Sequence, residues 1–269
     1  MSRPPVGAQP NSPIALSVLI RTLNEEDRLA KTLESALPLQ AEIVVVDAGS
    51  TDRTVEIARS YGARVVTNPW EGFGQQRRFG EMQCSNNFVF SLDADEILTP
   101  EIVSEIRSLF LKDSPPSLIR LRKALVPPHW DRPPPLGYCH EYVLIYDRKI
   151  ARTKPDPNWD TLEIDVKSAP YTIKSPLLHF SFRDINHMTT KAVQIARLAA
   201  NTMPARSSGM MNLRLLVEFP LSFLKFYFVR RYCLAGLDGF VLAIVSAYGR
   251  FIRVAMMRER AILEKRKSV

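Results

Sequence analysis

From residue 14 onward, short runs of apolar residues alternate with stretches in which apolar residues recur every three or four positions. The first pattern is typical of strands buried on both faces, and the second of helices that pack one face on a sheet. Their alternation predicts an α/β fold with a mostly parallel sheet flanked by helices. We expect strands at residues 14–20, 41–47, 64–68 and 87–92. Helices are expected at residues 24–37, 52–63 and 99–110, and a further helix runs through Met82.

Beyond residue 112 the alternation becomes irregular. Strands are expected at residues 117–126, 141–149 and 171–182, and a helix at 185–203. Seven prolines lie between Pro115 and Pro135. Proline lacks a backbone donor and breaks helices, so this segment is predicted to be a loop-rich insertion and not a helix.

The C-terminal segment over residues 204–269 is rich in Phe, Tyr, Leu and Arg together. Arg230, Arg231, Asp238 and Arg250 interrupt its apolar runs, so no uncharged run reaches the roughly 20 residues that cross a bilayer. We expect two amphipathic helices hinged at residues 235–239, lying in a membrane interface with their basic side chains toward phosphates. The alternative is a helical hairpin that packs on its own domain or on a dimer partner.

The distribution of charge supports a membrane partner over a nucleic acid. The net charge is +8, and the chain from Met203 onward holds 12 Lys and Arg against 4 Asp and Glu, so the remainder is neutral. The excess charge accompanies aromatic and aliphatic residues, which argues against nucleic-acid binding. Residues 1–13 lack the apolar core of a secretion signal and are expected to form a disordered tail, and the three cysteines have no CxxC spacing, so we expect a cytoplasmic protein.

Acidic residues follow two of the predicted strands. Asp47 ends one strand, and Asp93 and Asp95 follow another, at the sheet edge where α/β proteins bind ligands. Neither loop has a GxGxxG or GxxxxGK motif, which argues against dinucleotide and P-loop sites. Residues i and i+2 of an extended segment face the same side, so the two aspartates can share Mg²⁺ or Mn²⁺ with a substrate diphosphate. The alternative is that these carboxylates only favour the dipole of the next helix.

Four stretches carry a resemblance: residues 17–37, 42–66, 72–80 and 88–101 occur in the order and spacing of glycosyltransferase family 2, which has the GT-A fold. The segments PWEGFGQQRRFG and LLHFSFRD, together with the aromatic C-terminal stretch, resemble more narrowly the bacterial lipopolysaccharide core β-glucosyltransferase group. That group acts at the inner face of the cytoplasmic membrane. The resemblance implies a nucleotide-sugar-binding half over residues 14–112, an acceptor-binding half over 113–203, and membrane-associating helices over 204–269.

The resemblance also implies roles for single residues. Asp47 would bind the uracil or ribose, with Asp52 as its neighbour, and Arg77 and Arg78 would lie near the donor diphosphate unless they form a solvated helix face. Asp93 and Asp95 would bind the metal and Asp93 also the donor. The other residues implied to line the nucleotide pocket are Thr22, Asn24 and Glu25.

The general base and a third metal ligand are less closely defined. Related sequences often have a His-Glu pair where this chain has Trp159 and Asp160, so Asp160 is our first choice for the base, followed by Glu163 and Glu141. His179 would complete the metal site, or else it is a core histidine at the end of an apolar strand.

We therefore expect an inverting, metal-dependent transferase that moves a hexose, glucose above all, from a UDP-sugar or similar donor to a membrane glycolipid such as the lipopolysaccharide inner core. Two alternatives stay open. One is a transferase acting on a polyprenyl phosphate, and the other is a non-catalytic membrane-bound scaffold with a degenerate transferase fold.

Overall fold

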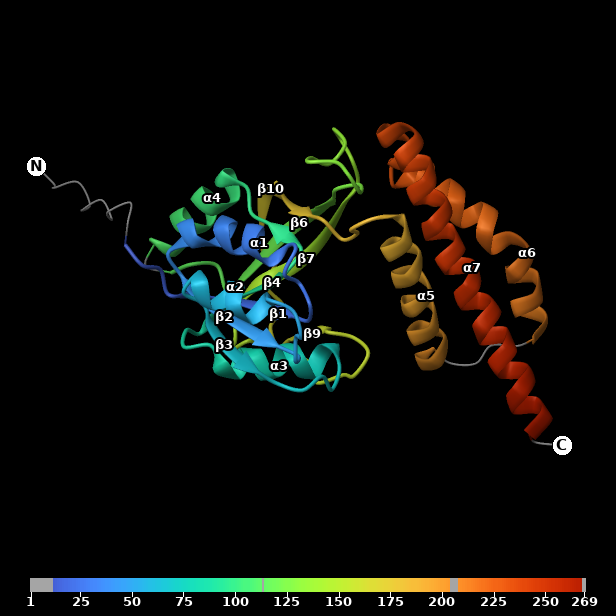
Figure 1. Ribbon diagram of the computed structural model, residues 1–269, viewed down its shortest axis with the longest axis horizontal. Coiled ribbons are helices and arrows are strands. Elements are labelled where there is room, and N and C mark those ends of the chain that lie inside the picture. The colour runs from blue at the N-terminus through green and yellow to red at the C-terminus, as the bar shows by residue number, and fades with distance from the viewer. Residues whose placement is uncertain (1–11, 113, 204–207, 268–269) are drawn as a thin grey trace, which may run out of the picture. The chain divides into compact units, whose positions relative to one another are not determined.

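The computed structural model describes residues 12–112, 114–203 and 208–267 (Figure 1). Nearly all of the predicted tail over residues 1–13, and residues 204–207 at the start of the predicted membrane segment, lie outside the described residues. The chain divides into two compact units. The first comprises residues up to 123 together with 140–179, and the second comprises 124–139 together with the chain from 180 onward.

The first unit is built on a sheet with the strand order β3-β2-β1-β4-β7-β6-β10-β5 among the described residues. Its first four strands are parallel, and β4 pairs with β7 in the antiparallel direction. A separate hairpin consists of β8 and β9. The strands are β1 (Leu16–Thr22), β2 (Glu42–Asp47), β3 (Arg64–Thr67), β4 (Phe88–Asp93), β5 (Glu96–Ile97), β6 (Leu118–Leu125), β7 (Cys139–Asp147), β8 (Ala151–Thr153), β9 (Leu162–Ile164) and β10 (Tyr171–His179).

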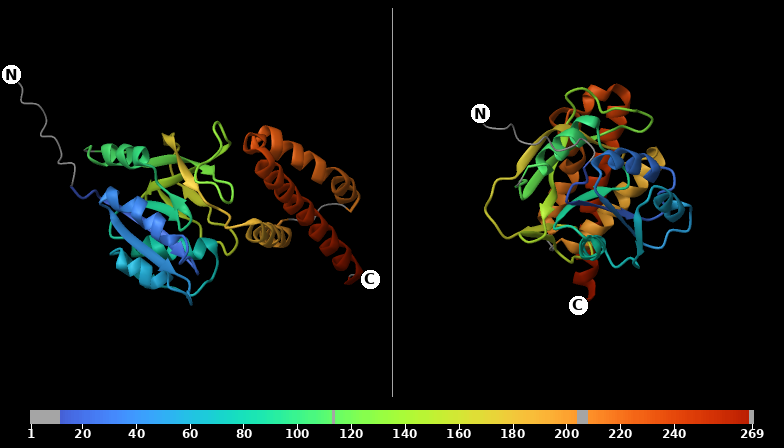
Figure 2. Two further views of the ribbon diagram at one scale, coloured as in Figure 1. Left: turned by 45° about the horizontal axis from the view of Figure 1, so that its top comes forward. Right: turned by 90° about the vertical axis from the view of Figure 1, so that its left-hand side faces the viewer.

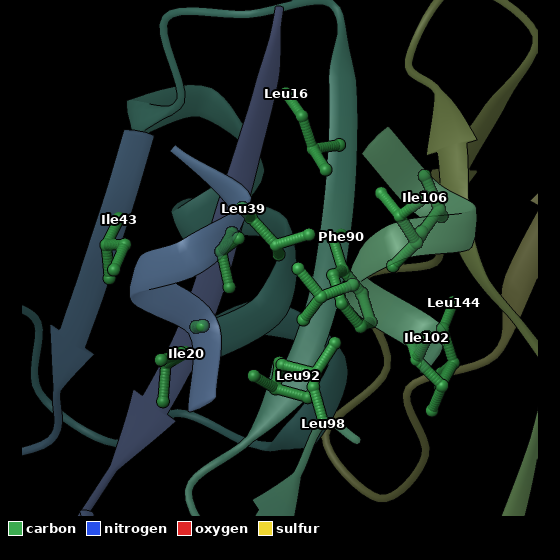
Figure 3. Close-up of a cluster of buried hydrophobic side chains, with 14 of the residues drawn as sticks. Leu16, Ile20, Leu39, Ile43, Phe90, Leu92, Leu98, Ile102, Ile106 and Leu144 are labelled. Atoms are coloured by element: carbon green, nitrogen blue, oxygen red, sulfur yellow. The ribbon is translucent and has the colours of Figure 1, made fainter. Parts of the chain in front are cut away.

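Helices cover both faces of the parallel strands, which explains why β1, β2 and β4 are buried at most positions. One core cluster packs strand residues such as Leu16, Ile20 and Phe90 with Ile102 and Ile106 (Figure 3). A second cluster contains Leu19, Val44, Val46 and Val89. The helices of this unit are α1 (Leu29–Ala36), the short turn η1 (Leu37–Leu39), α2 (Thr54–Ser60), α3 (Phe73–Gln83) and α4 (Pro100–Phe110). The predicted α/β fold is confirmed.

Two helix starts show where local chemistry could and could not be predicted. Thr99 caps α4, since its hydroxyl accepts a hydrogen bond from the Ile102 amide at 3.4 Å, and Pro100 is the first helical residue. The helix predicted from residue 24 begins only at Leu29. Asn24 has a φ of 55°, in the left-handed region, so the backbone cannot enter a helix there.

The second unit is helical. It contains α5 (Ile185–Thr202), α6 (Ser208–Leu224), the π-helical turn η2 (Lys225–Val229), the 3-10 turn η3 (Tyr232–Ala235) and α7 (Gly236–Lys267). Within this unit α7 lies between α5 and α6 and packs against both (Figures 1 and 2). The chain reverses between Arg230 and Gly236, slightly before the predicted hinge.

The loop between β6 and β7 is anchored to this helical unit. The Trp130 indole donates to the Asp238 carboxylate at 2.8 Å, and the Arg231 guanidinium donates to the Leu136 carbonyl at 3.1 Å. In the described chain, one helical segment over Tyr232–Arg266 is long and apolar enough to span a membrane by length and composition alone. Core helices of soluble proteins pass the same test, so this is weak evidence.

Candidate functional site

The loops that follow β1 and β2 are joined by hydrogen bonds. The Asn24 side-chain oxygen accepts from the Thr51 backbone amide, and the backbone amide of Asn24 donates to the Ser50 hydroxyl, each at 2.9 Å. The Asp52 carboxylate accepts from the Glu26 amide at 3.2 Å. Asn24 and Asp52, predicted to line the nucleotide pocket, are therefore positioned by each other's loops.

Asp47 is the buried centre of the second of these loops. Its side chain accepts from the Thr22 hydroxyl at 3.1 Å, from the Ser50 hydroxyl at 2.5 Å and from the amides of Gly49 and Ser50 at 2.9 Å. The residue is only 2% exposed. Both carboxylate oxygens thus shape the loop, and a contact of Asp47 with a nucleoside stays a prediction.

Asp93, at the end of β4, is surrounded by basic side chains. Arg21 and Lys123 each place a nitrogen 3.0 Å from one of its oxygens, and Arg77 lies 3.8 Å away. Burial alone would raise the pKa of this carboxyl, but the charges of Lys123, Arg21 and Arg77 outweigh it and hold the pKa well below its usual range. Asp93 is therefore ionised and neutralised by this protein's own cations.

Two of these arginines also bind Asp160. Arg21 and Arg77 each place a guanidinium nitrogen 2.8 Å from the same Asp160 oxygen. The predicted base and the first aspartate of the DxD motif, 67 positions apart in the chain, are thus linked through shared cations. We call Arg21, Arg77, Asp93 and Asp160 the strand-end cluster.

Arg21 and Lys123 are not among the predicted site residues, and the role of Glu96 was left open. Arg21 lies directly opposite Asp93 in the parallel pairing of β1 and β4, so only the sheet register brings the two together. Lys123 is 8% exposed and forms ion pairs with Asp93 and the fully buried Glu96. Burial raises the pKa of Glu96, partly offset by the Lys123 charge. The available signal was the single basic residue of β1; β6 has three basic residues, so its sequence alone does not single out Lys123.

Asp95 faces a different group of residues. Its carboxylate lies 3.5 Å from the His179 imidazole and 3.6 Å from Arg28, which in turn donates to Glu25 at 2.8 Å. Burial lowers the pKa of His179, but the hydrogen bond and charge of Asp95 outweigh this, so the pKa is raised. The structure thus brings together Glu25, Asp95 and His179 among the predicted site residues.

A divalent metal fits part of the predicted ligand set. Asp95 offers a carboxylate oxygen, the donor that Mg²⁺ and Mn²⁺ prefer, and the His179 imidazole nitrogen lies 3.5 Å from it. Asp93 instead contacts Arg21 and Lys123, and no group of three or more His, Cys, Asp or Glu side chains in the described chain is arranged to hold a metal. The fit rests on Asp95 and His179, and a role for Asp93 stays a prediction.

The glycines at the start of α3 hold the segment that leads to Asp160. The amide of Gly74 donates to the Asp156 carbonyl at 2.9 Å. A Cβ atom on Gly74 would lie 2.3 Å from the Lys154 carbonyl oxygen, and one on Gly72 would lie 2.3 Å from the Pro157 Cα. Only glycine allows this close approach, so this motif positions the loop that carries Asp160.

The remaining predicted residues lie apart from the strand-end cluster. Arg78 pairs with the buried Glu81 at 3.1 Å, and Glu141 pairs with Arg120 at 3.6 Å. Glu163 lies exposed on β9. Among the ion pairs and hydrogen bonds seen in the described residues, none joins Arg78, Glu141 or Glu163 to Asp93 or Asp160.

Comparisons with known proteins agree on one family. The family described as Glycosyl transferase family 2 matches residues 17–148. The chain is 31% identical to an uncharacterized glycosyltransferase of Rickettsia conorii, covering 93% of this chain and 92% of that one. It is 28% identical to the lipopolysaccharide core biosynthesis glycosyltransferase LpsC of Rhizobium meliloti, covering 95% and 96%.

Among solved structures, one similar protein is glucosyl-3-phosphoglycerate synthase from Mycobacterium tuberculosis, crystallised with Mn²⁺, UDP and glucosyl-3-phosphoglycerate. The match is 28% identical, covers 42% of this chain and 44% of that one, and has a TM-score of 0.34.

Proposed function

Because this chain belongs to glycosyltransferase family 2, we propose that it is an inverting, metal-dependent hexosyltransferase acting on a membrane glycolipid. The observation that carries this proposal is the strand-end cluster. It gathers two arginines and two carboxylates at the carboxyl ends of β1 and β4, where α/β proteins bind their ligands. The proposed donor is a UDP-hexose, with UDP-glucose first.

The donor would bind between the loops after β1 and β2 and the cations of the cluster. Guanidinium groups match diphosphate oxygens in charge and geometry, so Arg21 and Arg77 are suited to hold the diphosphate. When bound, Mg²⁺ or Mn²⁺ would neutralise the charge that develops on the departing diphosphate. Asp95 and His179 would hold it, with Asp93 nearby. The residues proposed to shape the nucleotide pocket are Thr22, Asn24, Glu25, Asp47 and Asp52.

Asp160 is proposed as the general base. Its carboxylate would take the proton of the acceptor hydroxyl while that oxygen attacks the anomeric carbon and the bond to the diphosphate breaks. Attack from the face opposite the leaving group inverts the anomeric configuration. Arg21 and Arg77 pair with the Asp160 carboxylate, and the donor diphosphate would compete for these two guanidinium groups. Glu163 and Glu141 are the next candidates.

The acceptor and the location are inferred from the relatives and from charge. LpsC is named for lipopolysaccharide core biosynthesis and aligns with nearly the whole chain, which supports a glycolipid acceptor. The basic excess of the C-terminal segment supports an anionic membrane surface at the cytoplasmic face.

A transfer assay tests this function. Purified protein is incubated with a panel of sugar nucleotides and deacylated core glycolipid, and the products are read by mass spectrometry. We expect a gain of one hexose, lost in Asp160→Asn and kept in Asp165→Asn, an exposed aspartate five positions away. Normal turnover by the Asp160→Asn, Glu163→Gln double variant on a polyprenyl phosphate would favour that anionic acceptor, and turnover of no donor would favour the scaffold.

A further inference from the structure

Helix α6 exposes apolar side chains and buries charged ones, the reverse of a surface helix in water. Its outward positions form one continuous stripe along the helix, and Leu216 and Leu213 are 77% and 66% exposed. Every side chain of this stripe is apolar, and the other exposed side chain described on α6, Asn212, accepts a hydrogen bond from Arg258 at 2.5 Å. The stripe, which we call the α6 outer face, comprises Met210, Leu213, Leu216, Val217, Pro220, Leu221 and Leu224.

The charged residues of α6 lie on its inner side. Glu218 is 7% exposed and pairs with Arg214 at 2.6 Å on its own helix, and with Arg250 at 3.2 Å and Arg253 at 3.8 Å on α7. In water, a surface helix places its charges outward and its leucines inward. Here the ion pairs are turned toward the neighbouring helix and the leucines toward the surroundings.

We propose that the α6 outer face inserts into an anionic lipid bilayer. A contiguous apolar patch without polar side chains fits hydrocarbon, because hydrocarbon demands no hydrogen bonds from its partner. Exposed apolar side chains continue past the end of the helix at Phe228 and Val229, where Lys225 and Arg231 are exposed beside them. These basic side chains can reach lipid phosphates while their stems stay with the acyl chains.

A second copy of this chain is the competing occupant, and charge argues against it. The segment from Met203 onward has 12 basic and 4 acidic residues, so two copies joined at this surface would bring like charges together. An anionic headgroup layer supplies the opposite charge. The inference deepens the membrane part of the proposed function, and it makes no use of the catalytic site.

The first test is sedimentation of the full chain with vesicles of phosphatidylcholine and phosphatidylglycerol, without donor or acceptor. We expect Leu213→Ser, Leu216→Ser to lower the partition coefficient at least tenfold. The matched control Leu37→Ser, Leu111→Ser changes two leucines that are 45% and 38% exposed in the first unit, and it should partition like wild type. Equal partition of the two double variants overturns the proposal.

A second test reports on insertion directly. In Leu216→Trp we expect vesicles to shift the added fluorescence to the blue and brominated acyl chains to quench it, with neither effect in Leu111→Trp. No shift at position 216 overturns the proposal. A lipid-free dimer that Leu213→Ser, Leu216→Ser dissociates, without vesicle binding, also overturns it. UDP binding is measured separately on the same samples. Protein that binds UDP but not vesicles contradicts only the membrane proposal, and protein that binds vesicles but not UDP contradicts only the transferase proposal.

Discussion

Among the described residues, the strand-end cluster and the cluster around Glu218 both hold carboxylates with arginines, and they differ in how exposed the carboxylates are. In the strand-end cluster the Asp93 and Asp160 side chains are 29% and 35% exposed and share Arg21 and Arg77. In the helical unit the Glu218 side chain is 8% exposed, and its arginines come from α6 and α7. The first cluster can exchange partners with a ligand, whereas the second serves to join two helices.

The largest effect is expected at Asp160. Asp160→Asn keeps the volume of the side chain but removes the base, so kcat should fall by about 10²–10⁴-fold. The dissociation constant for UDP should change by less than about threefold, since Arg21 and Arg77 remain available. Turnover assays and calorimetry on the same preparation separate the two quantities, and Asp165→Asn is the control. A decrease in kcat of less than tenfold would show that another residue is the general base.

Gly74→Ala should have the next largest effect on kcat. The added methyl group would overlap the Lys154 carbonyl, so the loop that carries Asp160 must move away from α3. A displacement of about 1 Å at a reacting group can cost about 10²-fold in rate. We expect kcat to fall more than UDP affinity does. Met82→Ala, at a residue 62% exposed on the same helix, should leave both near wild type. Loss of both quantities in equal measure would contradict a positioning role.

Glu218→Ala should lower the stability of the fold and not the affinity for UDP. It leaves three arginines without their buried partner, and we expect about 1–3 kcal/mol of lost stability in urea unfolding, below the value for a fully buried pair because Arg250 is partly exposed. UDP affinity should not change, which would separate this cluster from the strand-end cluster. The conservative Glu218→Gln should lose less, since it keeps one acceptor oxygen for the hydrogen bond from Arg214. A change in UDP affinity in either variant would break the distinction.

Glu42 offers a third, smaller case, in which hydroxyl and amide donors hold a carboxylate. Burial raises its pKa, but hydrogen bonds from Ser17, Ser85 and Arg64 outweigh this and lower the pKa from 4.5 to about 2. Because the folded state favours the ionised form, the added stability is complete above pH 4.5 and is lost as pH falls toward 2. Urea unfolding at pH 3 and pH 6 should show a smaller pH difference in Glu42→Gln than in wild type. An unchanged difference would exclude this contribution.

Local and periodic features of the fold could be predicted from the sequence, and contacts across the sheet could not. The apolar strands and the Thr99 cap follow from neighbouring residues. The link between Arg21 and Asp93 depends on the register between β1 and β4, which the pattern of apolar residues does not specify. The amphipathic character of the C-terminal helices was predicted. Which side of α6 faces inward depends on its packing against α7, where Arg214 pairs with Glu218, and the orientation of the basic side chains toward phosphates stays a prediction.

The central proposal is that Asp95, with His179, holds a divalent metal that strengthens the binding of a UDP-sugar. Calorimetric titration of UDP-glucose with and without Mn²⁺ tests it most directly, in wild type, Asp95→Ala and the control Asp165→Ala. We predict that Mn²⁺ tightens binding at least tenfold in wild type and in the control, and that Asp95→Ala abolishes this gain. Binding that is independent of Mn²⁺, or a gain that survives Asp95→Ala, would contradict the account.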